Sequence, residues 1–101
     1  MNIKKEASGD SASALETVRA DIDRVDLQVI ELFGKRAELV RCLAELKKGG
    51  PIRDPDRERE VLEKVKGLAL KKGLRPDVVE NVYRILFRYF VELQQEKREQ
   101  T

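Results

Sequence analysis

The stretch that decides the fold is Leu15–Leu46, LETVRADIDRVDLQVIELFGKRAELVRCLAEL. Apolar residues recur along it in steps of three and four, with one gap at Arg36, which is the period of a helix with a coiled-coil-like seam. Gly34 is the one glycine in the stretch, and proline does not occur in it. We therefore predict one continuous helix from about Ser13 to Lys48. The seam consists of Leu15, Val18, Ile22, Val25, Val29, Leu32, Leu39, Leu43 and Leu46.

Turn and capping residues divide the rest of the chain into two further helices. The sequence GGP at residues 49–51 ends the first helix, because glycine suits the C-terminal cap and proline forbids continuation. A second helix is expected from Asp54, an N-cap followed by proline, to Gly73. A third is expected from Pro76 to about Lys97. The predicted fold class is all-α, with three helices in the order long, short, long.

The length of the first helix predicts the quaternary structure. About 36 helical residues extend for roughly 54 Å, whereas a compact chain of 100 residues has a radius of gyration near 13 Å. The seam would therefore extend beyond anything that the other two helices can cover. We predict that a second copy covers it, in an intertwined homodimer. Residues 1–11 are polar and small and are interpreted as a disordered tail, so that the helical domain comprises residues 12–101.

Composition narrows the classes of function. Charged residues make up 40% of the 101 residues, but the net charge is only +2, which gives no support for binding to nucleic acid or membranes. The chain has no histidine, which excludes a Ser-His triad, a histidine proton shuttle and a histidine-rich metal site. Its single cysteine, Cys42, is expected as a small core residue and fits a reducing compartment. Without a signal-like or membrane-spanning segment, the expected location is the cytoplasm.

Arg36 stands where the seam requires an aliphatic residue. Burying an unpaired guanidinium costs several kcal/mol, so Arg36 needs an anion, an acidic neighbour or a path to water. Lys47 lies eleven residues later, which corresponds to a rotation of about 20° and a rise of about 16 Å on the same helix face. Two long cationic side chains can therefore reach into one pocket.

Further polar residues are expected near this helix face. Arg57 and Glu58 belong to the first turn of the second helix, just after the Gly-Gly turn, and Gln94 lies close to the apolar stripe of the third. A pocket of these three side chains with Arg36 and Lys47 would be cationic, with one carboxylate and one amide. It would suit a small dianion that carries a hydroxyl group.

Taken together, VRADIDRVDLQVIELFGKR at residues 18–36, the spacing to Lys47, RDPDRERE at residues 53–60 and the late Gln94 resemble the all-helical chorismate mutases. The resemblance covers about residues 14–96. It implies an intertwined dimer of three-helix protomers and the rearrangement of chorismate to prephenate in aromatic amino-acid biosynthesis. That reaction uses no metal, cofactor or covalent intermediate.

The resemblance also implies roles for individual residues. Arg36, and Arg19 from the partner protomer, correspond to the arginines that hold the two carboxylates of the substrate. Lys47 corresponds to the lysine that binds the ether oxygen and a carboxylate, and Gln94 to the second donor to that oxygen.

Three positions at the start of the second helix match the end of the family's site that reads the ring hydroxyl. Asp54, through its backbone, and Glu58 correspond to the hydroxyl readers, and Arg57 supports the cluster. The remaining charged residues of this segment are interpreted as solvated surface, namely Arg53, Asp56, Arg59 and Glu60.

Phe90 departs from the family pattern. Many members carry there a small hydroxyl residue that helps to bind a carboxylate, and phenylalanine cannot donate that hydrogen bond. The related isochorismate-pyruvate lyases can carry an aromatic residue there, but they tend to lack the acidic hydroxyl reader that Glu58 provides. The alternatives are therefore an isochorismate-pyruvate lyase or an amino-deoxychorismate mutase and, outside enzymes, a helical dimerisation module whose charges all lie on the surface.

Overall fold

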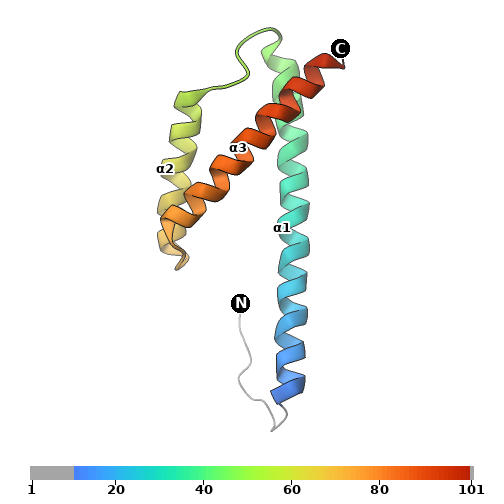
Figure 1. Cartoon of the computed structure of the whole chain (residues 1–101), viewed down its shortest axis with the longest axis vertical. Coiled ribbons are helices and arrows are strands. Elements are labelled where there is room, and N and C mark those ends of the chain that lie inside the picture. The colour runs from blue at the N-terminus through green and yellow to red at the C-terminus, as the bar shows by residue number, and fades with distance from the viewer. Residues whose placement is uncertain (1–10, 101) are drawn as a thin grey trace. The chain divides into compact units, whose positions relative to one another are not determined.

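A computed structural model of the chain describes residues 11–100, and these form three α-helices (Figure 1). The helices are α1 (Ser11–Lys47), α2 (Pro55–Lys71) and α3 (Pro76–Glu99). Over the described range there is no strand, so the predicted all-α class and the order long, short, long are confirmed. The tail predicted at residues 1–11 lies outside the described residues, except for Ser11, which begins α1.

Local signals set the ends of the helices as the sequence predicts. The N-cap of α2 is Asp54, whose carboxylate Oδ1 accepts a hydrogen bond from the backbone N–H of Arg57 at 3.1 Å. Beyond the end of α1, Gly49 has a φ of +79°, in the left-handed region that glycine adopts without steric cost. At the end of α2, Gly73 has a φ of +73°, and the N–H of Leu74 donates to the carbonyl of Ala69 at 2.9 Å. This geometry is a Schellman motif, which stops the helix at this point.

The chain divides into two units, residues 1–36 and residues 37–101. In the first unit the described residues, 11–36, form the N-terminal part of α1, and none of them is buried. Four of the seam side chains here are exposed, from 39% at Val29 to 66% at Leu32, and Val18 and Val25 are half-buried. Gly34 does not interrupt the helix. This part of α1 therefore presents an apolar face that its own unit leaves uncovered.

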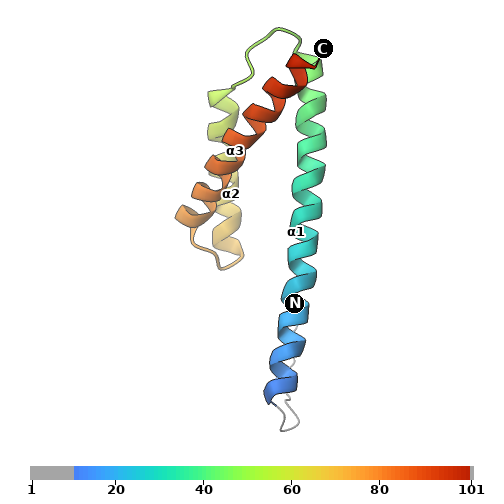
Figure 2. The same ribbon diagram turned by 45° about the vertical axis from the view of Figure 1, so that its right-hand side comes forward.

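The second unit contains the core. The core cluster comprises Ala37 and Val40 from α1 and Phe90 and Leu93 from α3, with the partly buried Leu86 packed against it. In α2, by contrast, the buried residues are Leu62 and Ala69. Helix α2 lies beside α3 in both views (Figure 2).

Within residues 37–100, ion pairs join α3 to each of the other helices. Lys66 on α2 lies 3.4 Å from the Glu80 carboxylate on α3. Near the other end of α3, Lys97 lies 3.1 Å from the Glu45 carboxylate on α1. Within residues 11–100 no helix combines the length and the apolar character that crossing a membrane requires.

The face that α1 buries in the second unit differs from the predicted seam. Ala37, Val40 and Ala44 are buried there, whereas the seam residues Leu39, Leu43 and Leu46 are exposed. The prediction that Cys42 is a core residue is wrong, because its side chain is exposed. Cys42 lies two residues from Val40 and two from Ala44, which places it about 160° away from both around the helix.

Candidate functional site

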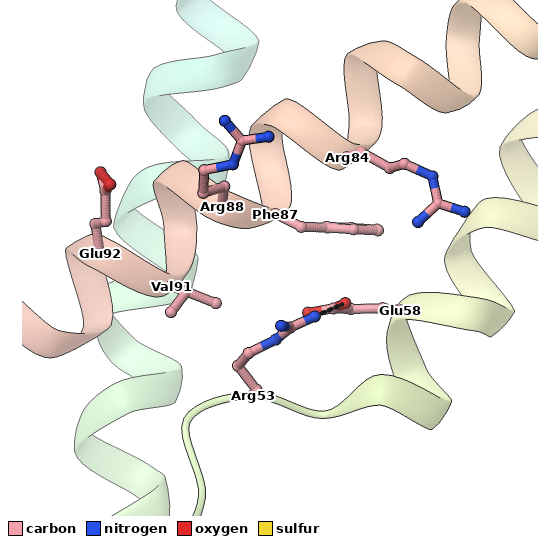
Figure 3. Close-up of a pocket in the computed structure, with 7 residues that line it drawn as sticks. All are labelled: Arg53, Glu58, Arg84, Phe87, Arg88, Val91 and Glu92. Carbon is pink, nitrogen blue, oxygen red and sulfur yellow. Dashed lines mark hydrogen bonds and ion pairs between the residues drawn. The ribbon is translucent and has the colours of Figure 1, made fainter.

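A pocket of about 340 Å³ lies between the start of α2 and the middle of α3 (Figure 3). Arg53 and Glu58 contribute one wall, and α3 contributes the other. Figure 3 shows Phe87 and Val91 facing the Arg53–Glu58 pair, whereas Arg88 and Glu92 point away from that pair. The pocket therefore offers both charge and an apolar wall. Its lining residues are Arg53, Glu58, Arg84, Phe87, Arg88, Val91 and Glu92.

The Glu58 carboxylate is the acidic group at the centre of this arrangement. Arg53 Nη2 donates to Glu58 Oε1 at 2.8 Å, and the Glu58 side chain is only 21% exposed. This hydrogen bond and the attraction between the two charges raise the pKa of Arg53 above its ordinary value. Arg53 is exposed, as predicted, but it also pairs with Glu58 and lines the pocket, which the sequence interpretation missed.

Lys47, the last residue of α1, is held by the loop that follows it. Its ammonium Nζ donates to the backbone carbonyl of Ile52 at 2.8 Å, and the side chain is half-buried. Lys47 lines a second pocket, of about 530 Å³, which includes Arg53 and Asp54. Arg53 therefore belongs to both pockets, with Lys47 in one and Glu58 in the other.

Asp54 uses its acceptors within α2. Its carboxylate Oδ1 caps the helix, and its carbonyl accepts a hydrogen bond from the N–H of Glu58 at 2.9 Å. These two contacts engage Oδ1 and the backbone carbonyl of Asp54. The role of the Asp54 backbone in binding a ligand stays a prediction.

The structure does not bring Arg57 to either pocket. Its side chain is 69% exposed and lies 3.5 Å from the Glu60 carboxylate, one helical turn away. Arg59 likewise pairs with Asp56 at 3.1 Å and is 68% exposed, as expected for solvated surface. A role for Arg57 near a ligand requires its side chain to leave Glu60.

Gln94 is the buried polar residue of α3, with 6% of its surface exposed. Its side-chain oxygen Oε1 is buried and has no hydrogen-bond partner among residues 11–100. Leaving a buried acceptor unsatisfied costs about 1–3 kcal/mol, and such groups in folded proteins often mark functional positions. Phe90, one turn earlier, packs in the core with Ala37 and Val40 and lines neither pocket.

The two remaining predicted site residues belong to the first unit. Arg19 is exposed, and its guanidinium lies 3.4 Å from the Glu16 carboxylate on the same helix. Arg36 is half-buried. The residues that line the Lys47 pocket and the Glu58 pocket all belong to the second unit.

The family model described as chorismate mutase type II matches residues 18–95, which is more than half of the chain. This match includes all eight of the predicted site residues. The chain belongs to the chorismate mutase type II family.

The curated relatives described next differ in how much of their own length this chain matches. A chorismate mutase from Methanocaldococcus jannaschii is 28% identical over 89 residues, which cover 86% of this chain and 90% of the relative. The T-protein of Haemophilus influenzae is 39% identical over 77 residues, or 74% of this chain. The bifunctional chorismate mutase/prephenate dehydratase of Buchnera aphidicola is 32% identical over 78 residues, or 75% of this chain. The chain spans only 20% of the length of each of these last two relatives.

For this member of the chorismate mutase type II family, the sequence interpretation expected Gln94 of the third helix beside Glu58, but it missed the α3 residues that line the Glu58 pocket. Arg84, Phe87, Arg88 and Val91 follow one another at the spacing of a single helix face, so their common location was readable from the sequence. The sequence does not show that this face of α3 lies against the start of α2, because helix periodicity carries no information about which helices pack together.

Proposed function

We propose that the chain is a chorismate mutase, which rearranges chorismate to prephenate in aromatic amino-acid biosynthesis without a cofactor. The observation that carries the proposal is the Glu58 carboxylate, held at 2.8 Å by Arg53 on an arginine-lined pocket within the family-matched region. The relative from Methanocaldococcus jannaschii, of which the match covers 90%, is named chorismate mutase, which supports the same activity.

The chemistry of this rearrangement fits the residues that the chain provides. One carbon–oxygen bond breaks while a carbon–carbon bond forms within the same molecule, so no proton acceptor, nucleophile or metal is required. A protein accelerates such a step by holding the flexible arm of the substrate over the ring. It also aims donors at the oxygen on which negative charge grows.

Lys47 and Gln94 are the proposed donors to the ether oxygen. Lys47 is already oriented by its hydrogen bond to Ile52, and it would exchange this carbonyl for the substrate. Gln94 would donate from its amide nitrogen Nε2, while its buried Oε1 has no partner within residues 11–100. Glu58 and the backbone of Asp54 would meet the ring hydroxyl, with Arg57 supporting this end of the site.

The carboxylates of the substrate require cations, and we assign them to Arg36 and to Arg19 of the partner subunit. A homodimer is supported by the first unit, where none of residues 11–36 is buried and the apolar seam remains exposed. An amphipathic helix gains most of its stability from packing of its apolar face. A second copy that packs along this seam would supply that packing in an intertwined dimer. The single cysteine of the chain favours the reducing cytoplasm as its location.

A lyase acting on isochorismate, or a mutase acting on amino-deoxychorismate, is the second candidate. Phe90 favours the lyase because a buried phenyl ring replaces the hydroxyl donor, whereas Glu58 favours the mutase.

Incubation of the protein with each of the three substrates, followed by identification of the products, tests both. We expect the protein to form prephenate from chorismate. A protein that releases pyruvate from isochorismate but does not convert chorismate would overturn the proposed function. No turnover of any substrate, with no rise in melting temperature on adding dicarboxylates, would indicate a dimerisation module.

A further inference from the structure

We propose that Arg53 is a positioning residue, which holds the Glu58 carboxylate in place to accept a hydrogen bond from the ring hydroxyl of the substrate. This inference rests on the proposed function and adds to it a residue that the sequence interpretation assigned to solvated surface. It starts from the 2.8 Å contact between Arg53 Nη2 and Glu58 Oε1 (Figure 3).

The Arg53–Glu58 pair differs from the other arginine pairs at the start of α2. Arg57–Glu60 and Arg59–Asp56 join residues three apart on one helix, a spacing at which surface pairs form on any helix. Arg53 and Glu58 are five residues apart, and Arg53 precedes the helix. Their contact therefore fixes the carboxylate relative to the loop between α1 and α2, and not merely along the surface of α2.

Burial is also distributed differently in this pair. The Glu58 side chain is 21% exposed, whereas both partners in the Arg57–Glu60 pair are 69% exposed. Glu58 lies in the pocket opposite Phe87, and Arg53 reaches it from the loop that precedes α2 (Figure 3). Arg53 binds Oε1 of Glu58, and the second carboxylate oxygen can accept a hydrogen bond from a hydroxyl group. The geometry thus orients Glu58 without consuming its capacity to bind a ligand.

The same loop orients a second proposed ligand. The carbonyl of Ile52, the residue before Arg53, accepts the 2.8 Å hydrogen bond from Lys47. Two residues before Ile52, the backbone carbonyl of Gly50 accepts a hydrogen bond from Arg98 Nη1 of α3 at 2.8 Å. Consecutive residues, Ile52 and Arg53, therefore hold Lys47 and Glu58, and α3 anchors the loop that carries them. Orienting groups before a ligand binds lowers the cost of organising the site.

The test compares Arg53→Gln, Arg53→Lys, Glu58→Gln and the double variant Arg53→Gln/Glu58→Gln in steady-state kinetics with chorismate. Arg53→Gln is expected to raise KM on the order of tenfold, with kcat changed by less than about threefold, because a displaced Glu58 weakens ligand positioning. Arg53→Lys, which keeps the charge, should recover part of this loss. In the Glu58→Gln background, Arg53→Gln should have no further effect, because the group that it positions is already altered.

The matched control is Arg59→Gln, which removes an arginine of similar exposure that pairs with Asp56. It should leave both kinetic constants unchanged, and circular dichroism should show equal helix content for all variants. A wild-type protein that converts chorismate, together with an Arg53→Gln variant of unchanged KM, would overturn the positioning role alone. Additive effects of the two substitutions, or a loss in kcat at constant KM, would overturn it as well. A wild-type protein that does not convert chorismate would refute the proposed function, and with it the role of Arg53.

Discussion

Lys47 and Ile52 are joined across the loop between α1 and α2 by a hydrogen bond of 2.8 Å from the lysine ammonium to the backbone carbonyl. The contact links the last residue of α1 to the residue just before Arg53. It closes the chain around the Gly-Gly-Pro turn and fixes the direction of a half-buried cation. A lysine with three donors can keep this bond or exchange it for a ligand oxygen with little movement.

The first prediction concerns this lysine. Lys47→Met keeps a side chain of similar length but removes the charge and the donors. We expect kcat for chorismate to fall about 10²–10³-fold, the size of the loss when one donor to a developing oxyanion is removed. The neighbouring Lys48→Met, which changes an exposed lysine, is the control and should retain wild-type kinetics. A Lys47→Met enzyme with more than a tenth of the wild-type kcat would show that this donor is not needed.

The second prediction concerns Phe90 as a core residue. Its ring is only 3% exposed and packs with Ala37 and Val40, so Phe90→Ala should lower the free energy of unfolding by about 3–5 kcal/mol. Tyr89→Ala, at a neighbouring ring that is 49% exposed, should cost clearly less. Urea unfolding at one fixed protein concentration makes the comparison valid for a chain that associates. Equal losses for the two variants would contradict the core assignment.

The third prediction uses the burial of Gln94, which is 6% exposed. The carboxyl group introduced by Gln94→Glu can donate to the ether oxygen only while it is protonated. Burial disfavours the charged form, so its pKa should lie above the ordinary value of about 4.3 for glutamate. Activity of the variant should therefore be present at acidic pH and decline as the pH rises through that pKa.

The wild-type protein is the reference for this pH profile. An amide does not titrate, so Gln94 gives the wild-type enzyme no pH dependence of its own, and wild-type activity should be roughly flat from about pH 6 to 9. A Gln94→Glu variant with the same activity at pH 8 as at pH 5 would rule out the donor role of Gln94.

The helix ends were predictable because their signals are local. Asp54 caps α2 with its own carboxylate, and Gly73 adopts the left-handed conformation required directly after that helix. Each signal depends on a few neighbouring residues, which the sequence displays. The same is true of the predicted all-α fold, since the helical period is a property of one chain segment.

The buried face of α1 was not predictable in the same way. This helix carries apolar residues both in the seam, such as Leu39 and Leu43, and on the face of Val40 and Ala44. Periodicity shows that both sets exist, but only the packing of α3 shows which set its own unit buries. The Arg53–Glu58 contact escaped prediction for a related reason, because it depends on the path of the loop that precedes α2.

The last prediction tests the dimer and the site together. Arg19 lies seventeen residues before Arg36 on α1, which is about 25 Å along the helix and roughly 100° around it. An arginine side chain is far shorter than this distance, so both residues cannot bind one small ligand within a protomer. If both hold substrate carboxylates, Arg19 must serve the site of the partner subunit. Arg19→Ala and Arg36→Ala homodimers should therefore each lose more than nine-tenths of kcat/KM while remaining folded by circular dichroism.

Mixing the two inactive variants should restore activity. In a mixed dimer, one site receives the intact Arg36 of one protomer and the intact Arg19 of the other, and the second site receives neither. Random exchange after joint unfolding and refolding makes about half of the dimers mixed, each with one complete site of two, so about a quarter of the wild-type activity should return. Each variant refolded alone is the control, and mass spectrometry of the intact dimers measures the exchange. Complete exchange with activity no higher than that of the parents would show that the two arginines do not share a site across the dimer.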